Sequence, residues 1–117
     1  MNSLIKQIFK DFEVGGVNIP VAFLRYNGKS TTYITYQEMN INETFYGDDE
    51  LMNYISYYDF DIYTKGDIFP IIKSVKKILK ENGFKWQPQN SSTDMYEDDT
   101  GYYHKTLNFS IIRNEED

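Results

Sequence analysis

The chain has 117 residues, of which 40% are hydrophobic and 17% aromatic, and its formal net charge is −6. This length favours one domain (1–117) that buries about 65% of the surface of the unfolded chain. The negative charge argues against binding to a nucleic-acid backbone, and the absence of cysteine excludes disulfides and thiolate metal sites. Because the sequence has neither an apolar run of membrane-spanning length nor a signal-peptide pattern, we expect a cytosolic protein.

The N-terminal part predicts a short helix followed by an edge strand. Residues 3–12 have the apolar spacing of a helix, and a glycine pair should end it, so that residues 1–16 form a helix and a turn. The apolar stripe of this helix consists of Leu4, Ile5, Ile8, Phe9 and Phe12. Residues 17–26 contain Pro20, which favours an edge strand or an extended arm, and residues 31–38 alternate as a further strand.

The middle of the sequence joins a polar segment to a strongly alternating one. Residues 39–51 are rich in Asn, Asp and Glu, so we predict a mobile excursion between two strands. Residues 53–63 alternate strictly, which predicts a strand that turns Tyr58, Phe60 and Ile62 toward a helix. The intervening residues would form its opposite, solvated face.

Residues 67–84 contain the most regular helix pattern in the sequence. Apolar residues recur at helical spacing, and lysines occupy much of the opposite side. The stripe consists of Ile68, Ile71, Ile72, Val75, Ile78 and Leu79. Asp67 is expected as the N-cap and Gly83 as the left-handed residue after the last turn. A stripe this broad must pack on a sheet.

The C-terminal part completes that sheet. Residues 85–93 predict a short strand that runs into a loop, and residues 94–96 and 102–112 predict a hairpin around residues 97–101. Residues 113–117 should form a frayed acidic tail. The order of elements predicts an α+β fold, with an antiparallel or mixed sheet of about four to five strands and two helices packed on one face.

No arrangement of residues in the sequence indicates catalysis, a metal site or a cofactor. His104 is the only histidine, and its place inside a predicted strand favours a structural or surface role. Asp59 and Asp61 share a strand face and would suit general acid–base chemistry or a cation, although a solvated sheet face is the simpler interpretation. The common phosphate-binding and hydrolase motifs are missing. We therefore expect no enzymatic activity.

Charge is distributed unevenly along the chain. Residues 38–67 are strongly acidic, whereas the helix at 67–84 and its exit carry five lysines (Lys73, Lys76, Lys77, Lys80 and Lys85) against Glu81. Unlike patches on one subunit suit head-to-tail association, although an ordinary solvated helix face is an equally good explanation of the lysines. The candidate residues for contact with a neighbouring subunit or another assembly partner are Phe45, Tyr46, Asp48, Asp49, Glu50, Lys73, Lys76, Lys77, Glu97 and Asp98. The eleven tyrosines add to this interpretation, because tyrosine is enriched at interfaces.

A series of short motifs resembles a known family. They are IPV at 19–21, YITY at 33–36, FDIY at 60–63, NGF at 82–84 and MYEDDTGYYHK at 95–105. In this order, across residues 17 to 112, they resemble the small tail-terminator, or tail-completion, proteins of long-tailed bacteriophages and phage-like particles. The hairpin at 95–105 is the most specific of these motifs, and the N-terminal helix has no close counterpart in the resemblance.

The resemblance implies a structural virion protein rather than an enzyme. Such a protomer assembles in the host cytoplasm, closes as a hexameric ring on the last ring of tail-tube protein, stops tube growth and forms the tail side of the head–tail junction with connector proteins. DNA passes through the lumen without being bound specifically. We expect Asp59 and Asp61 to face that lumen and repel phosphate.

Three other functions fit parts of the sequence. A small acidic, tyrosine-rich protein also suits a DNA mimic that inhibits a host nuclease or defence system, with the acidic segments around Asp48 and Asp98 imitating phosphates. Another neck or connector protein is a further alternative, and an enzyme that uses Asp59 and Asp61 is the last. The terminator predicts a ring, the mimic predicts a monomer or dimer that binds a basic host protein, and the enzyme predicts a concave pocket around the two aspartates.

Overall fold

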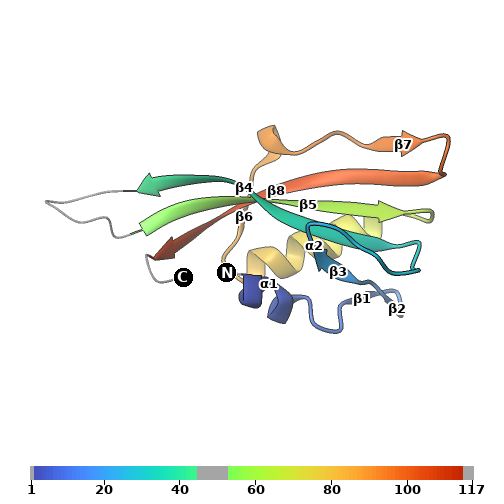
Figure 1. The fold of residues 1–117 in the computed structure, drawn as a ribbon, viewed down its shortest axis with the longest axis horizontal. Coiled ribbons are helices and arrows are strands. Elements are labelled where there is room, and N and C mark those ends of the chain that lie inside the picture. Colours follow the sequence, from blue (N-terminus) through green and yellow to red (C-terminus); the bar gives the residue numbers. More distant parts are fainter. Residues whose placement is uncertain (1, 45–52, 115–117) are drawn as a thin grey trace, which may run out of the picture.

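The computed structural model of the chain describes residues 2–44 and 53–114 (Figure 1). In chain order the elements are α1 (Asn2–Ile8), β1 (Glu13–Val14), β2 (Val17–Asn18), β3 (Val21–Phe23), β4 (Tyr33–Thr44), β5 (Asn53–Thr64), α2 (Phe69–Glu81), β6 (Lys85–Trp86), the 3₁₀ turn η1 (Pro88–Asn90), β7 (Met95–Glu97) and β8 (Tyr102–Asn114). None of the helices in these ranges is long and apolar enough to span a membrane.

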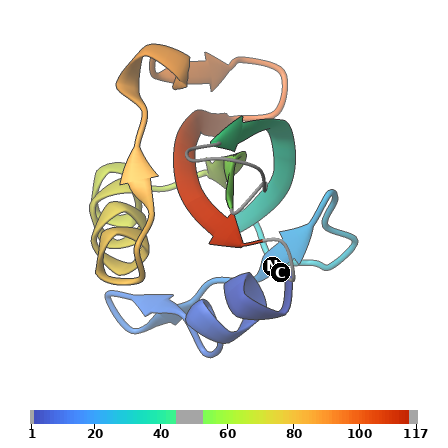
Figure 2. The same ribbon diagram turned by 90° about the vertical axis from the view of Figure 1, so that its left-hand side faces the viewer.

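Six of these strands form one mixed sheet. Its order is β3-β4-β5-β8-β6, with β7 also paired to β8. The short edge strand β3 runs parallel to β4, and every other pair in the sheet is antiparallel. Figure 1 shows both helices below β4, β5 and β8, and the end-on view in Figure 2 shows a curled sheet with its strand β7 at the top, away from α1. The predicted α+β class and the placement of both helices on one face are therefore confirmed, in a sheet one strand larger than expected.

The core lies between the sheet and the two helices. The ring of Phe60 in β5 is fully buried at its centre, with its centroid 6.0 Å from those of Phe9 and Phe109 and 6.1 Å from that of Phe84. Val75 and Leu79 of α2 are also fully buried. The predicted stripe of α2 is thus the packed face, except that Ile78 is only partly buried.

Both ends of α2 follow from local sequence, with one correction. The helix begins at Phe69 with Ile68 at the N-cap position, so the predicted N-cap, Asp67, was placed one residue too early. Asp67 still contributes, because its Oδ1 accepts a hydrogen bond from the Phe69 amide at 3.1 Å. At the other end Gly83 has a φ of +90°, and the Phe84 amide donates to the Leu79 carbonyl at 3.0 Å, as in a Schellman motif.

The segment after α1 differs from the prediction. α1 ends at Ile8, and the two glycines at 15 and 16 do not end it but form the turn of the β1–β2 hairpin. Their φ values of +59° and +82° match the two-residue turns that such hairpins use. The packing of the predicted stripe is nevertheless correct, because Ile5, Phe9 and Phe12 are buried in the core.

The largest correction concerns the predicted excursion at 39–51. Residues 39–44 continue β4 as a strand paired with β5, after a β-bulge between Glu38 and Asn40. The remainder, 45–52, lies outside the described residues. At the C-terminus β8 likewise continues through Asn114, so Arg113 belongs to the sheet and not to a frayed tail.

Candidate functional site

Three strands of the sheet continue past both helices and form an arm. Figure 1 shows β4, β5 and β8 running beyond the helix layer, and the molecule measures 53 Å along this direction against 27 and 24 Å across it. We define the arm as residues 39–44, 53–56 and 111–114, and the body as the other described residues. Met39, Ile41 and Ile112 in the arm are 52%, 51% and 67% exposed. The arm therefore presents apolar side chains that the body does not cover.

One edge of the arm is open because β3 is short. β3 pairs with β4 only as far as Tyr36, whose carbonyl accepts one further hydrogen bond from the Leu24 amide at 2.9 Å. Leu24 has a φ of +68°, unusual for a bulky residue, and here the chain turns away from β4. Within the described part of the chain no strand pairs with the outer side of β4 from Gln37 onward.

The opposite edge of the arm is open for a similar reason. β6 pairs with β8 only at Phe109 and Ser110. Among residues 2–44 and 53–114, no strand pairs with this side of β8 from Ile111 to Asn114. An unpaired strand edge exposes a row of backbone donors and acceptors that another chain can use. The arm thus has two such edges, one on each side.

The root of the arm is fixed by a polar contact across all three strands. The Arg113 guanidinium in β8 donates through Nη1 to Glu38 Oε2 in β4 at 3.0 Å and to Ser56 Oγ in β5 at 2.9 Å. The Arg113 guanidinium also lies 5.8 Å from the ring of Tyr54. These contacts hold β4, β5 and β8 at a defined spacing where the helix layer ends.

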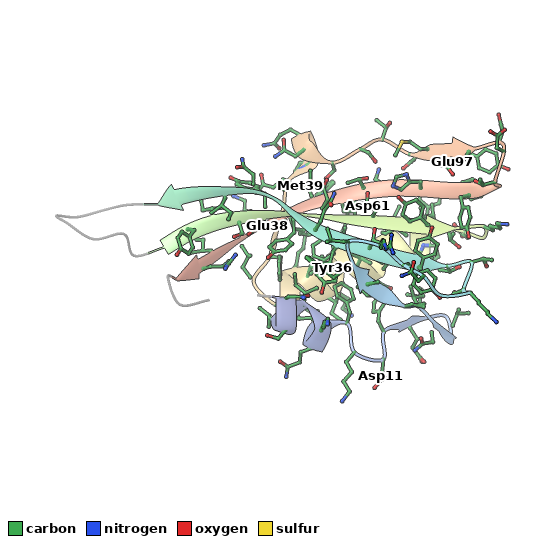
Figure 3. All side chains as sticks on the ribbon, in the orientation of Figure 1. Asp11, Tyr36, Glu38, Met39, Asp61 and Glu97 are labelled. Atoms are coloured by element: carbon green, nitrogen blue, oxygen red, sulfur yellow. The ribbon has the colours of Figure 1, made fainter. Side chains whose placement is uncertain are left out.

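The sheet face away from the helices holds the two aspartates singled out in the sequence. Figure 3 shows Tyr36 on the helix side and Asp61 on this opposite side. Asp61 accepts hydrogen bonds from Thr106 Oγ1 and, at 3.2 Å, from His104 Nε2, and its side chain is only 17% exposed. Asp59 Oδ1 accepts a hydrogen bond from Asn108 Nδ2 at 2.7 Å. The two carboxylates share a face, as predicted, but they are bound to β8 and not freely solvated.

Burial changes the protonation of this face. It raises the pKa of the Asp59 carboxyl, the hydrogen bond from Asn108 lowers it, and nearby Asp61 raises it. Burial, followed by the Asp61 carboxylate, raises the pKa of Tyr63 to about 12. The described residues contain no group of three His, Cys, Asp or Glu side chains that could hold a metal ion.

A row of stacked rings crosses the same face. The rings of Tyr26, Tyr33, Tyr63 and His104 stack in that order, with centroid separations of 4.7, 4.9 and 4.2 Å. His104 is therefore held between a stacked ring and the Asp61 carboxylate. This arrangement fits the structural role expected for the only histidine.

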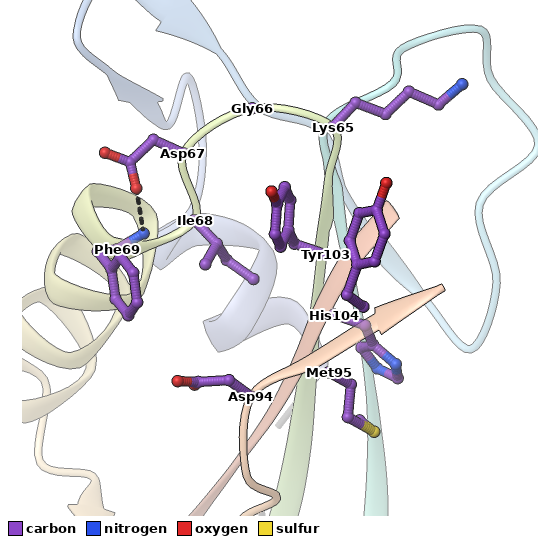
Figure 4. Close-up of a pocket in the computed structure, with 10 residues that line it drawn as sticks. Lys65, Gly66, Asp67, Ile68, Phe69, Asp94, Met95, Tyr103 and His104 are labelled. Atoms are coloured by element: carbon purple, nitrogen blue, oxygen red, sulfur yellow. Dashed lines mark hydrogen bonds between the residues drawn. The ribbon is translucent and has the colours of Figure 1, made fainter. Parts of the chain in front are cut away.

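His104 also borders a largely apolar cavity (Figure 4). The cavity has a volume of about 500 Å³ and lies between the loop at 65–69 and the β7–β8 hairpin. Phe69, Met95, Tyr96 and Tyr103 line it and are partly exposed. At its rim the Asp94 carboxylate is paired with the Lys105 ammonium at 2.9 Å. Its lining suits an apolar side chain better than acid–base chemistry.

The predicted charged contacts are only partly on one surface. Lys73 and Lys77 are exposed on α2, but the Lys76 ammonium lies 3.6 Å from the centre of the Trp86 ring, which joins α2 to β6. Burial, followed by Lys105 and Lys80, lowers the pKa of Lys76. Lys76 is therefore engaged inside its own chain. Glu97 and Asp98 are exposed in the β7–β8 hairpin, at the other end of the molecule from the arm (Figure 3).

The other predicted contact residues, Phe45, Tyr46, Asp48, Asp49 and Glu50, lie outside the described residues. The exposed apolar residues of the arm were not among the predicted contacts. One signal for them existed: Ile111 and Ile112 are adjacent in a strand, so only one of them can face the core.

No protein-family model matches the chain, and no curated protein matches its sequence. Function therefore has to be argued from the surfaces described above.

Proposed function

We propose that the protein is a structural subunit that closes as a ring, of six copies, on the end of a phage-type tail tube. There it would stop tube growth and form the tail side of the head–tail junction. The observation that carries this proposal is the arm, which offers two open strand edges on opposite sides. Different surfaces on two sides of one subunit are what a head-to-tail ring requires. The resemblance described above supports the same conclusion.

The proposed partners are further copies of the chain, the tail-tube protein and the connector proteins of the head. The ring would assemble in the host cytoplasm and remain at the head-proximal end of the tail in the virion. We propose no catalytic activity, since the Asp59 and Asp61 carboxylates are engaged by Asn108, Thr106 and His104. DNA would pass through the ring without specific contacts.

The orientation of the aspartates toward the lumen stays a prediction. If the sheet face away from the helices lines the lumen, the half-buried Asp59 and Asp61 would add negative charge beneath its surface. Because both carboxylates are engaged by side chains of β8, their main role would be to keep phosphate from binding.

The decisive experiment deletes the gene for this protein from the genome of the particle that encodes it. Tails assembled without it should be longer than normal or should fail to join filled heads, and electron microscopy of the lysate measures both. Supplying the intact chain from a plasmid should restore length and joining, whereas a chain truncated before β8 should not. Tails of normal length that join heads without the protein would overturn the proposal and favour the DNA-mimic inhibitor.

A further inference from the structure

The two open edges of the arm run in the same direction. β4 and β8 each pair antiparallel with β5, on its two sides, so they are parallel to each other. A copy placed beside another in the same orientation would bring the outer edge of its β8 against the outer edge of the next β4. Each copy would then use one edge of each kind, which is a heterologous contact.

The two edges also match in extent and character. The bulge between Glu38 and Asn40 interrupts β4 and leaves a regular stretch from Asn40 to Thr44. The open part of β8, from Ile111 to Asn114, is of similar length. Exposed strand edges usually carry lysine or proline, which discourage pairing. Neither open stretch contains lysine or proline, and Ile41 and Ile112 are more than half exposed.

A second copy fits both edges better than an unrelated strand does. An unrelated strand on either edge would leave the other edge of the same subunit open. Only repetition of the same contact uses both edges in every subunit once the ring closes. Pairing would also cover the exposed isoleucines of the arm along both faces of the continuous sheet.

We infer that β8 of one copy, at Ile111 to Asn114, pairs in parallel with β4 of the next copy, at Asn40 to Thr44. The inference rests on the proposed ring and names the contact that holds it. The sheet of each arm then continues into the arm of its neighbour, through backbone hydrogen bonds and without domain swapping.

Cysteine cross-linking tests this contact cleanly because the chain has no cysteine of its own. Ile112→Cys is combined with either Asn40→Cys or Asn42→Cys. All three positions lie on the same face of the sheet, so the two double variants test two possible registers of β8 against the neighbouring β4. Inside one chain β5 separates these positions, so they are two strand spacings, about 9.5 Å, apart. A disulfide needs Cα atoms within about 7 Å, so any disulfide must join two copies.

On mild oxidation we expect one of the two double variants to give a ladder of covalent multimers that ends at the ring, and reductant should abolish it. The matched control is Ile41→Cys with Ile112→Cys, whose positions alternate to opposite faces, and it should give no ladder. Ile55→Cys with Ile112→Cys pairs directly in the β5–β8 ladder and should give an oxidised monomer. The same oxidation is repeated on purified tails, in case the ring closes only on the tube.

The outcomes separate the contact from the function. Dimers from Asn40→Cys or Asn42→Cys alone would mean that β4 pairs with β4, and would overturn the inference. If a mass measurement finds a ring but neither double variant gives a ladder of cross-linked multimers, the proposed contact is overturned and the terminator proposal stays intact. A ladder from a protein whose removal leaves tails normal would support the contact and refute the terminator function.

Discussion

The body and the arm share the strands β4, β5 and β8, yet they bury the side chains of these strands to different extents. Where α1 and α2 cover β5 and β8, Phe60, Leu107 and Phe109 are fully buried. A few residues further along, Ile41 and Ile112 are mostly exposed. Strand pairing alone therefore does not decide burial in this sheet. Ile112 is on the face away from the helices and Ile41 lies past the helix layer, whereas Ile111 at the base of the arm is still buried. The free energy of folding should come from the body, which leaves the arm free to bind another chain.

The most damaging change predicted by this comparison is Val75→Asp. Val75 is fully buried between α2 and the sheet, and an unpaired carboxylate there costs several kcal/mol, a large part of the stability of a domain. Circular dichroism should show an unfolded chain. Lys77→Asp, on the exposed side of the same helix, is the control and should stay folded. A folded Val75→Asp protein would contradict the packing of α2.

Truncating a side chain in the body should lower the free energy of unfolding far more than truncating one in the arm. Phe60→Ala removes the central ring of the core and should lower the free energy of unfolding by about 3–5 kcal/mol. Ile112→Ala should change it by less than about 0.5 kcal/mol, because that side chain is exposed. Urea titrations of the two variants measure both values. Equal losses would mean that the arm contributes to the core.

The lysines of α2 sharpen the comparison at a smaller scale. Lys76→Glu removes the cation–π contact with Trp86 and should cost about 0.5–2 kcal/mol of folding free energy. Lys73→Glu and Lys77→Glu should leave stability nearly unchanged and, if this face meets a neighbour, weaken assembly. Thermal unfolding and mass measurements in solution separate the two effects. A variant with all three lysines changed to glutamate would not separate a loss of stability from a loss of assembly.

The smallest expected effect is the pH dependence due to Asp59. Its pKa is raised by burial, so the folded chain holds the proton more tightly than the unfolded chain does. Stability is therefore lost as the pH rises from the pKa of the unfolded chain through this raised pKa, whereas below both pKa values Asp59 is protonated in both states and has no effect. Asp59→Asn should gain stability relative to the natural chain between acid and neutral pH. A difference that does not change with pH would contradict this.

Local signals in the sequence predicted the body well. The left-handed turn at Gly83 and the stripe through Val75 and Leu79 are encoded within a few residues of one another, so α2 could be placed from sequence. Strict alternation gave the two faces of β5 correctly for the same reason.

The arm could not be predicted in this way. Asparagine at positions 40 and 42 is a poor strand former, and only pairing with β5 makes this segment a strand. The parallel pairing of β3 and the contact of Asp61 with His104 depend on registers between distant segments, 43 residues apart in the second case. Open edges are likewise a property of the whole sheet, because they exist only where β3 and β6 end.

The position of Trp86 has a practical consequence. It is the only tryptophan, its indole N–H donates to Ser91 Oγ at 3.1 Å, and the ammonium of Lys76 lies over its ring. Its fluorescence consequently originates from the seam between α2 and β6, with no contribution from tryptophan elsewhere. Tryptophan emission will follow the opening of that seam during unfolding, and binding of a neighbour at the arm will not change it directly until a second indole is introduced there.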